Sequence, residues 1–551
     1  MNIIPDPIII PVNTTWVSDG LEEEFPTWSS QQPVLISSQT GTGKNRFVME
    51  YLIPYARKTG QRVYLFTNRV ALSLQQKREL LHMDEYPNIF SNDELEKMTD
   101  FNHVSIINYQ SALQYLHQFG YENPIGAIYP DSHGFAIFDE AHFFLSDSLF
   151  NAQTQQILNR LIWTFSLYVR VYLTATPRDI LQVINKCEMT NLESEHITPF
   201  DMRNGNRMHR KRALYVYEFP RNYTDYNVAF FSSFEQLYGK LGKASSDNKW
   251  LCYVNDTQQQ TQIAKDLKDK YSISSVCFDS TKKGNSKLWN TLVDGQLPEN
   301  ILLTTIVLDN GVNITDPGLH NIVIDWSDDI SFLQMVGRKR RTDGEKINLY
   351  VRSPQQDQVV RRFKDVGNLL DFIQQYHLNP QNFLRANWQG FDQERRNLFD
   401  IDSRQHPVLN QFAWLELCKF HDFYKKLLFD MQNAPDERSA SEVYPKMVLG
   451  WLGLQQDVHW VAGINIENAI SEIRALLERY IEKGIPPEEH DKFFDQFARL
   501  ADIILNGYSK IRKDSRIAPS IMRDFLEKQR EQLGCYYSIG GRGTWKIRKE
   551  D

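Results

Sequence analysis

The stretch Ser38-Gln-Thr-Gly-Thr-Gly-Lys-Asn45 decides the fold of this chain. It follows the short apolar run Pro33–Ser37, which has the length and composition of a buried strand. Gly41 and Gly43 allow the backbone to turn tightly and to approach a phosphate without a Cβ in the way. The N–H groups of such a loop and of the following helix bind anions, and Lys44 adds a positive charge. The sequence therefore predicts a strand, a phosphate-binding loop and a helix, with an ordinary glycine-rich turn as the simpler alternative.

This loop departs from the usual phosphate-loop pattern at two positions. Ser38 stands where the first glycine is usual, and Asn45 stands where a Ser or Thr hydroxyl usually binds Mg²⁺. An amide oxygen can also coordinate Mg²⁺, directly or through a water molecule. The residues that we expect to bind the nucleotide are Thr40, Gly41, Thr42, Gly43, Lys44 and Asn45.

An acidic pair ends a second apolar run, Phe135–Phe138. Asp139 and Glu140 would lie at the carboxyl end of a strand, which is where open α/β sheets bind ligands. Alone, the pair would more often be a solvated turn. Matched with Lys44, it predicts an ATP site in which Asp139 holds Mg²⁺ and Glu140 orients or deprotonates the attacking water.

Strand and helix patterns alternate along the first two thirds of the chain, which is typical of parallel sheets covered by helices. The first series of strand candidates comprises Pro33–Ser37, Val63–Thr67, Val104–Asn108, Gly134–Asp139 and Val169–Thr174. After a connecting stretch of little pattern at 178–211, the second series comprises Ala213–Glu218, Lys249–Asn255, Ser274–Asp279, Asn300–Thr305, Asn321–Asp325 and Lys346–Val351.

Beyond Pro354, long amphipathic patterns such as Glu467–Lys483 and Pro487–Ile504 dominate, and they predict helices. A short glycine-rich tail, Cys535–Ile547, could form strands. The resulting division has an N-terminal extension at 1–29, α/β domains at 30–210 and 211–355, and an all-helical domain at 356–551.

A third group of polar residues lies in the second α/β domain. Gln334, Gly337, Arg338 and Arg341 have spacings of three and four, which would place them on one face of a helix. Arginines that face an ATP site neutralise charge that develops on the γ-phosphate. The four basic residues at 338–341 could instead bind the phosphates of a nucleic acid.

In their order, these motifs resemble those of superfamily 2 helicases and translocases of the DEAD/DEAH type. Motif I is 38–45, motif II is Asp-Glu-Ala-His at 139–142, motif III is Thr174-Ala175-Thr176, and motif VI is 334–341. Further matches are 67–69 and 108–110 for the motifs that contact a strand, 254–256 for motif IV, and 305–313, which contains Gly311, for motif V. No convincing adenine-reading glutamine segment precedes motif I, and this departs from the DEAD-box branch.

The resemblance implies two tandem RecA-like P-loop domains that bind ATP and Mg²⁺ in the cleft between them and nucleic acid across both. It assigns catalytic roles to Lys44, Asp139, Glu140, Gln334, Arg338 and Arg341, and nucleotide contact to Gly311. It assigns the coupling of hydrolysis to strand movement to Thr174 and Thr176. It assigns nucleic-acid contacts to Arg69, Asn108, Gln110, Asn255 and Thr305, each of which could equally be a cap, a turn residue or a core hydrogen-bonding group.

The region 356–551 resembles no family. Its residues between Lys510 and Lys549 carry a local excess of positive charge, which suggests contact with nucleic acid or a protein partner, although a solvated helix face would look the same. Tyr536, Tyr537 and Trp545 could stack on bases or pack the tail. Four tryptophans are expected to be core residues rather than stacking surfaces: Trp388, Trp414, Trp451 and Trp460.

Composition limits the class of protein. The 551 residues carry a net charge of −7, which argues against a generally basic nucleic-acid coat protein but allows a local basic groove. Five scattered cysteines without a Cys-x-x-Cys pair favour reduced thiols over disulfides or a zinc site. The sequence contains no signal-peptide pattern and no transmembrane run. We expect a cytoplasmic helicase or translocase that acts on DNA, or less favourably RNA, with a nucleotide-gated DNA-binding or assembly factor as the alternative.

Overall fold

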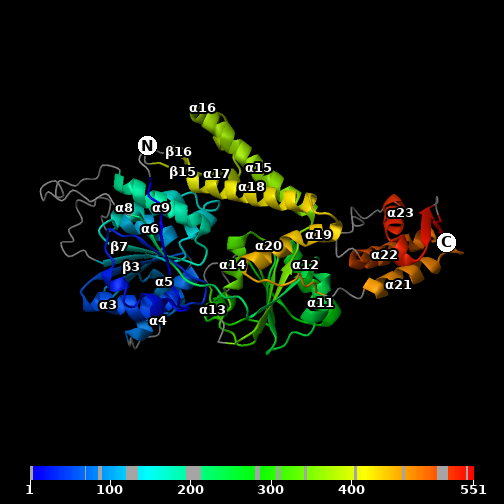
Figure 1. Ribbon diagram of the computed structural model, residues 1–551, viewed down its shortest axis with the longest axis horizontal. Coiled ribbons are helices and arrows are strands. Elements are labelled where there is room, and N and C mark those ends of the chain that lie inside the picture. Colours follow the sequence, from blue (N-terminus) through cyan, green and yellow to red (C-terminus); the bar gives the residue numbers. More distant parts are fainter. Residues whose placement is uncertain are drawn as a thin grey trace.

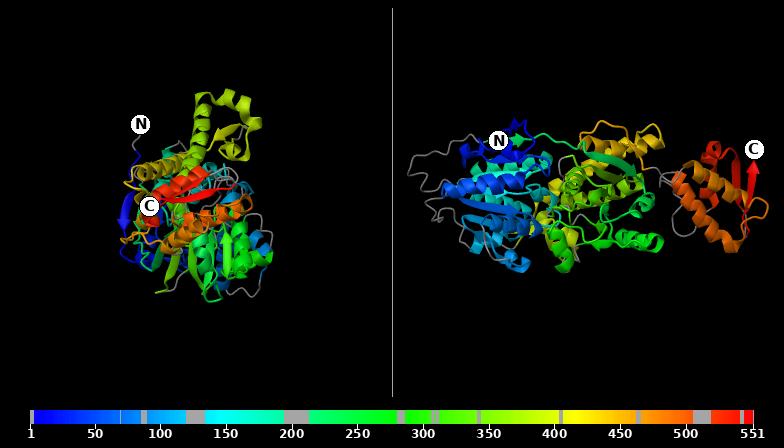
Figure 2. Two further views of the ribbon diagram at one scale, coloured as in Figure 1. Left: turned by 90° about the vertical axis from the view of Figure 1, so that its right-hand side faces the viewer. Right: turned by 90° about the horizontal axis from the view of Figure 1, so that it is seen from below.

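The computed structural model describes residues 4–68, 70–84, 90–118, 134–193, 213–279, 286–305, 308, 312–340, 344–402, 406–461, 466–504, 519–540 and 544–550. Two sheet domains lie side by side, long helices cross above them, and a small module lies at the C-terminal end (Figure 1). A second view, from below, shows the same order along the molecule (Figure 2). Within the described part of the chain, no helix is long and apolar enough to span a membrane.

The first sheet places three motif-bearing strands next to one another. In spatial order it comprises β1 (Ile8–Pro11), β8 (Tyr215–Glu218), β2 (Val34–Ser37), β7 (Val169–Thr174), β6 (Gly134–Phe138), β3 (Arg62–Thr67), β5 (Val104–Asn108) and β4 (Asp100–Phe101). All neighbours are parallel except β4 and β5. The residues of β2, β6 and β7 are buried throughout, because helices cover both faces of a parallel sheet. The carboxyl ends of β2, β7 and β6 therefore meet at one edge.

The second sheet is entirely parallel. In spatial order it comprises β11 (Val276–Phe278), β12 (Ile301–Thr304), β10 (Lys249–Tyr253), β13 (Leu319–Ile324), β14 (Ile347–Arg352) and β9 (Tyr226–Phe231). The prediction of two tandem RecA-like domains is confirmed. One strand assignment is wrong: β8, predicted to open the second series, pairs with β1 and β2 of the first sheet. Its neighbouring residues Val216 and Tyr217 are buried in the two core clusters on opposite faces of that sheet.

Helices cover both sheets. Those of the first domain are α1 (Val17–Leu21), α2 (Lys44–Phe47), α3 (Ile53–Lys58), α4 (Val70–Met83), α5 (Asn92–Lys97), α6 (Tyr109–Gln118), α7 (Phe143–Ser146), α8 (Thr154–Thr164) and α9 (Arg178–Glu193), with one π-helical turn at Val48–Leu52. Those of the second domain are α11 (Glu235–Leu241), α12 (Thr257–Tyr271), α13 (Ser286–Val293) and α14 (Asp329–Val336). Helix α9 occupies the start of the stretch that was expected to show little pattern, and Ile180 and Ile184 pack its apolar face into the core.

The region beyond Pro354 consists of two parts. The first is made of α15 (Gln356–Leu378), α16 (Pro380–Asn387), α17 (Gln393–Arg396), β15 (Phe399–Ile401), β16 (Pro407–Leu409), α18 (Gln411–Gln432), α19 (Glu437–Ser441) and α20 (Val443–Trp451). The antiparallel pair β15–β16 was not predicted. Trp388, Trp451 and Trp460 pack against apolar clusters as expected, whereas Trp414 is 36% exposed.

The second part has its own core. It is made of α21 (Ile466–Glu478), α22 (His490–Ile504), α23 (Pro519–Lys528), α24 (Arg530–Leu533), β17 (Tyr536–Gly540) and β18 (Lys546–Glu550). All members of its apolar cluster lie between Ala469 and Ile547. Tyr537 is buried, and the Trp545 ring lies 4.2 Å from the His490 ring, so both aromatic residues pack the tail. Lys510 lies outside the described residues.

Candidate functional site

The phosphate loop has the positive-φ backbone that its glycines predict. Gly41 and Gly43 have φ angles of +86° and +83°, a region that residues with a Cβ rarely adopt. The Thr42 hydroxyl donates to the Gln39 carbonyl oxygen at 2.7 Å. Lys44 Nζ donates to the carbonyl oxygens of Ser38 and Gln39 at 2.7 and 3.0 Å, so its ammonium lies inside the loop. Burial lowers the pKa of Lys44 to about 8.

The acidic pair lies at the end of β6. Asp139 N–H donates to the Phe66 carbonyl oxygen at 2.8 Å, which continues the sheet one residue beyond the strand. Glu140 has a φ of +50°, and its N–H donates to Asp139 Oδ1 at 3.0 Å. The Tyr109 hydroxyl donates to the Asp139 carbonyl oxygen at 2.9 Å. Left-handed backbone at a residue with a side chain is strained, and such strain is common where a side chain must be aimed at a ligand.

Two residues of α4 complete the candidate metal site. Gln76 Nε2 donates to Asn45 Oδ1 at 3.1 Å and to Asp139 Oδ2 at 2.8 Å, and it therefore lies between the two predicted metal ligands. Asn45 Nδ2 donates to Glu79 Oε2 at 2.7 Å, which fixes the orientation of that amide. Gln76 Oε1 is buried and has no hydrogen-bond partner. Converging oxygens suit Mg²⁺, so the residues present fit this ion.

Sequence reasoning missed Gln76 and Glu79. The available signal was their spacing of three residues on the helix that follows β3, which places both side chains on one face of α4. Their position opposite Asn45 depends on how α4 packs against α2, and that packing cannot be read from either segment alone.

The pKa values of the two carboxyl groups are shifted in opposite directions. Burial and the adjacent charge of Glu140 raise the pKa of Asp139 to about 6. Burial also opposes ionisation of Glu140, but the positive charges of His142, Arg338 and Lys44 outweigh it and lower the pKa of Glu140. Glu140 is therefore held as a carboxylate.

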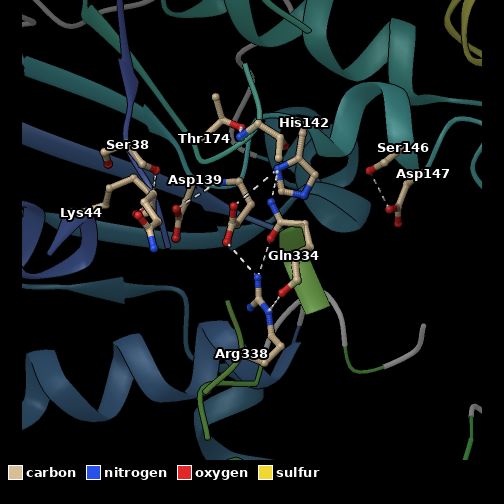
Figure 3. A network of polar contacts seen from close by, with 12 residues as sticks. Ser38, Lys44, Asp139, His142, Ser146, Asp147, Thr174, Gln334 and Arg338 are labelled. Atoms are coloured by element: carbon tan, nitrogen blue, oxygen red, sulfur yellow. Dashed lines mark hydrogen bonds and ion pairs between the residues drawn. The ribbon is translucent and has the colours of Figure 1, made fainter. Parts of the chain in front are cut away.

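A polar network crosses from the second domain to the first (Figure 3). Arg338 Nη2 donates to Glu140 Oε1 at 3.4 Å and to Gln334 Oε1 at 2.6 Å. Gln334 Nε2 lies 3.5 Å from His142 Nδ1. All four side chains are buried, so the network closes the space between the domains.

Motif VI is only partly helical, which corrects the prediction of a continuous helix. Helix α14 ends at Val336, and Arg338 follows in a turn in which its Nε donates to the Gln334 carbonyl oxygen at 3.1 Å. Gly337 packs so closely against Thr40 that a Cβ at Gly337 would collide with that side chain. Arg341 and Gly311 lie outside the described residues.

Arg340 is a site residue that the sequence reasoning did not single out. Its Nη1 lies 3.7 Å from the position of a Cβ on Gly41, next to the phosphate loop. Burial and the charge of Arg338 lower its pKa to about 10. The basic run at 338–341 was the available signal, but the register of the turn after α14 decides which arginine faces the loop.

Motif III links β7 to the phosphate loop. Thr174 Oγ1 accepts from Thr176 N–H at 3.1 Å, and the Thr174 carbonyl oxygen accepts from Ser38 N–H at 3.2 Å. The buried Thr176 hydroxyl has no hydrogen-bond partner. A shift of this segment would therefore be transmitted to the loop through main-chain bonds.

The predicted strand-contacting residues are spread over the ends of strands. Asn108 ends β5 and has a buried amide oxygen without a partner, and Gln110, two residues later in α6, is exposed. Asn255 Nδ2 donates to the Trp326 carbonyl oxygen at 2.8 Å, so this amide fixes a turn. Thr305 follows β12, and Arg69 lies outside the described residues.

The chain is similar to one family model and to several solved structures. Residues 14–179 match the family model described as "Type III restriction enzyme, res subunit", and no curated protein matches the chain. Among solved structures, the chain is similar to S. cerevisiae Dbp5 bound to RNA and ADP BeF3, with 15% identity and a TM-score of 0.41 over 59% of this chain and 80% of that one. It is also similar to the DEAD-box helicase Mss116 bound to ssRNA and UDP-BeF, with 12% identity and a TM-score of 0.46 over 96% of this chain and 99% of that one. The ordered motifs on two mainly parallel sheets resemble those of superfamily 2 helicases, and the family match covers the first domain.

Proposed function

We propose that this protein is a DEAH-type, nucleic-acid-dependent ATPase that couples hydrolysis of ATP to movement along DNA, or to its unwinding. RNA is the less favoured substrate. The observation that carries the proposal is the 3.4 Å contact between Arg338 Nη2 and Glu140 Oε1, because it joins the two domains at the carboxylate that would orient the attacking water. Five cysteines without a disulfide fit a cytoplasmic location.

The side chains have distinct roles in this mechanism. Lys44 moves from its loop carbonyl groups to the terminal phosphates of ATP, and ionised Glu140 accepts a hydrogen bond from water and aligns it. Arg338 and Arg340 neutralise charge that develops during transfer. Asn45 and Asp139 would hold a bound Mg²⁺, which would supply positive charge beside the phosphates of ATP.

Movement would follow from closing and reopening the cleft. Closure brings motif VI to the phosphate loop, and release of phosphate removes the charge that holds the domains together. The residues proposed to contact the sugar-phosphate backbone are Arg69, Asn108, Gln110, Asn255 and Thr305, and Thr174 and Thr176 would couple the two sites.

The test is steady-state ATPase activity with single-stranded, double-stranded and forked DNA and RNA, over a salt series. We expect stimulation by nucleic acid and its loss in Lys44→Ala and Glu140→Gln. Lys58→Ala, an exposed residue of α3, is the matched control and should retain activity. Unchanged hydrolysis in both site variants would refute the site, and hydrolysis that ignores every nucleic acid would refute the function.

A nucleotide-gated clamp on DNA is the second candidate function. It is favoured by Asn45, whose amide is tied to Glu79 and Gln76 where a hydroxyl is usual, since weaker handling of Mg²⁺ would slow turnover. Strand-displacement and translocation assays separate the two functions. Tight ATP-dependent binding without displacement or movement supports the clamp.

A further inference from the structure

Helix α18 spans the junction between the two sheet domains (Figure 1). Its N-terminal end is bound to the first domain: Asn410 Nδ2 donates to Thr154 Oγ1 at 3.0 Å, and Gln411 N–H donates to Gln155 Oε1 at 2.8 Å. Phe412 is buried in a core cluster of the first domain. These contacts fix one half of α18 to the domain that carries motifs I, II and III.

The C-terminal half of α18 packs on the second domain. The rings of Tyr424 and Trp326 lie 6.0 Å apart, edge to face. Leu427 and Met431 are buried in the large apolar cluster that contains residues of both sheets. One continuous helix therefore contacts both domains, and its contacts pass from the first domain to the second near its middle.

Lys419 lies at the point along α18 where its contacts pass from the first domain to the second. Its Nζ is 3.1 Å from Glu416 Oε1 on the same helix, 3.6 Å from Asp328 Oδ1 of the second domain and 3.8 Å from Asp179 Oδ2 of the first domain. Only 16% of the Lys419 side chain is exposed. A single ammonium group thus faces carboxylates from three parts of the chain.

The two carboxylates outside α18 lie close in the sequence to two of the motifs. Asp328 caps α14, because its Oδ1 accepts from Ile330 N–H and Ser331 N–H, and α14 carries Gln334. Asp179 lies in the first turn of α9, three residues after Thr176. Lys419 therefore links the helix that follows motif III to the helix on which motif VI begins.

Without Lys419 this junction would be acidic. Asp329 is also present, and its pair with Arg178 is long, at 3.9 Å, with an arginine that is 80% exposed. Burial opposes the charge of Lys419, but Asp328, Glu416 and Asp179 outweigh it and raise the lysine pKa. Removal of the ammonium would leave carboxylates of the two domains facing each other with little screening.

We propose that Lys419 is a positioning residue for the ATPase reaction. It holds the two domains in the closed arrangement in which Arg338 contacts Glu140. The inference rests on the proposed function for its kinetic consequence, but not for its structural one. An ordinary stabilising ion pair would change the melting temperature and leave the closing of the cleft unaltered, so the two roles give different results.

The experiment compares Lys419→Met, Lys419→Arg and Lys419→Met/Asp179→Asn, with Lys425→Met as an exposed control on the same helix. With ATP and nucleic acid, we expect Lys419→Met to lower kcat about tenfold, a loss of about 1.4 kcal/mol, with little change in KM for ATP. Arginine should restore most of kcat. The double variant should restore part of it, because the repulsion between domains is relieved.

Closure is measured independently by energy transfer between dyes at Lys58→Cys and Lys268→Cys, on exposed faces of α3 and α12, with Cys277, Cys418 and Cys535 replaced. Lower transfer in Lys419→Met than in wild type, with a non-hydrolysable ATP analogue, supports the inference. Equal energy transfer in folded Lys419→Met and wild-type proteins overturns the inference. Absence of ATPase activity in the wild type would refute only the proposed function, because the transfer measurement does not depend on hydrolysis. If Lys419→Met does not fold, the single variant Asp179→Asn is used instead. We expect it to lower kcat and energy transfer by less than Lys419→Met would, and unchanged values would overturn the inference.

Discussion

Gly337 of the second domain lies directly against Thr40 of the phosphate loop. A Cβ placed on Gly337 would stand 2.1 Å from Thr40 Oγ1 and 2.4 Å from Thr40 Cβ, distances that non-bonded atoms do not tolerate. The glycine is therefore required by the approach of the two domains, because its own φ is ordinary.

Gly337→Ala should impair closure rather than folding. The three atoms nearest to the added methyl group all belong to Thr40 of the other domain, so a slight separation of the domains would relieve the collision. We expect kcat to fall at least about tenfold, equivalent to about 1.4 kcal/mol, with the melting temperature nearly unchanged. Thr40→Gly in the same protein should recover part of kcat, and a Gly337→Ala enzyme with normal kcat would contradict the contact.

Asn45→Ala should weaken the response to Mg²⁺. The substitution removes one oxygen of the candidate metal site and leaves Gln76 without one of its acceptors. The Mg²⁺ concentration for half-maximal ATPase activity should rise about tenfold, the usual scale for loss of a metal-site contact. Arg46→Ala, which alters an exposed pair with Glu50 in the same turn, should leave that concentration unchanged. Chelation of divalent ions should stop hydrolysis in both proteins.

Glu188→Ala should strongly destabilise the first domain. Glu188 and Arg170 are fully buried and paired at 2.8 Å, and Tyr172 donates to the same carboxylate at 2.6 Å. Removal of the carboxylate leaves a buried guanidinium without a counter-charge, which costs about 3–5 kcal/mol. Thermal unfolding measures the effect, and Lys186→Ala on the exposed side of α9 should change little. A melting temperature close to that of wild type would show that water compensates Arg170.

Glu416 should make stability depend on pH. Burial raises its pKa from an ordinary value of 4.5 to about 7, so the folded protein retains a proton that the unfolded chain has lost. The stability contributed by this group is therefore present below pH 4.5 and decreases as the pH rises towards about 7. Relative to Glu416→Gln, the wild type should lose up to about 1.4 kcal/mol per pH unit in that window. Parallel unfolding curves across it would contradict the prediction.

A protein that ends at residue 461 should keep its ATPase activity. The apolar cluster of the C-terminal module lies wholly between Ala469 and Ile547, and Val461 still pairs with Phe230 of the second sheet in the shortened chain. We expect basal kcat within about twofold of the full chain, as for domains with separate cores. Loss of stimulation by nucleic acid alone would assign nucleic-acid binding to the module, whereas loss of basal hydrolysis would contradict its independence.

Local pattern predicted most strands of both sheets. Buried parallel strands are continuous apolar runs, and the runs before Ser38 and before Asp139 are of this kind. The same reasoning missed β1, β4 and β9 and assigned β8 to the wrong sheet. A short apolar run predicts a buried strand. Which strand it pairs with depends on packing against segments far away in the sequence.

The sequence by itself determined the chemistry of the candidate site: a lysine in a glycine loop, an acidic pair after a strand and arginines in a later segment. These are properties of contiguous residues, so spacing and residue type are enough to predict them. Only the tertiary structure brought Gln76 between Asn45 and Asp139, placed Arg340 beside Gly41, and set Lys419 among carboxylates of both domains. Such contacts depend on how whole helices and domains pack, which is decided by the summed burial of many side chains and not by any one motif.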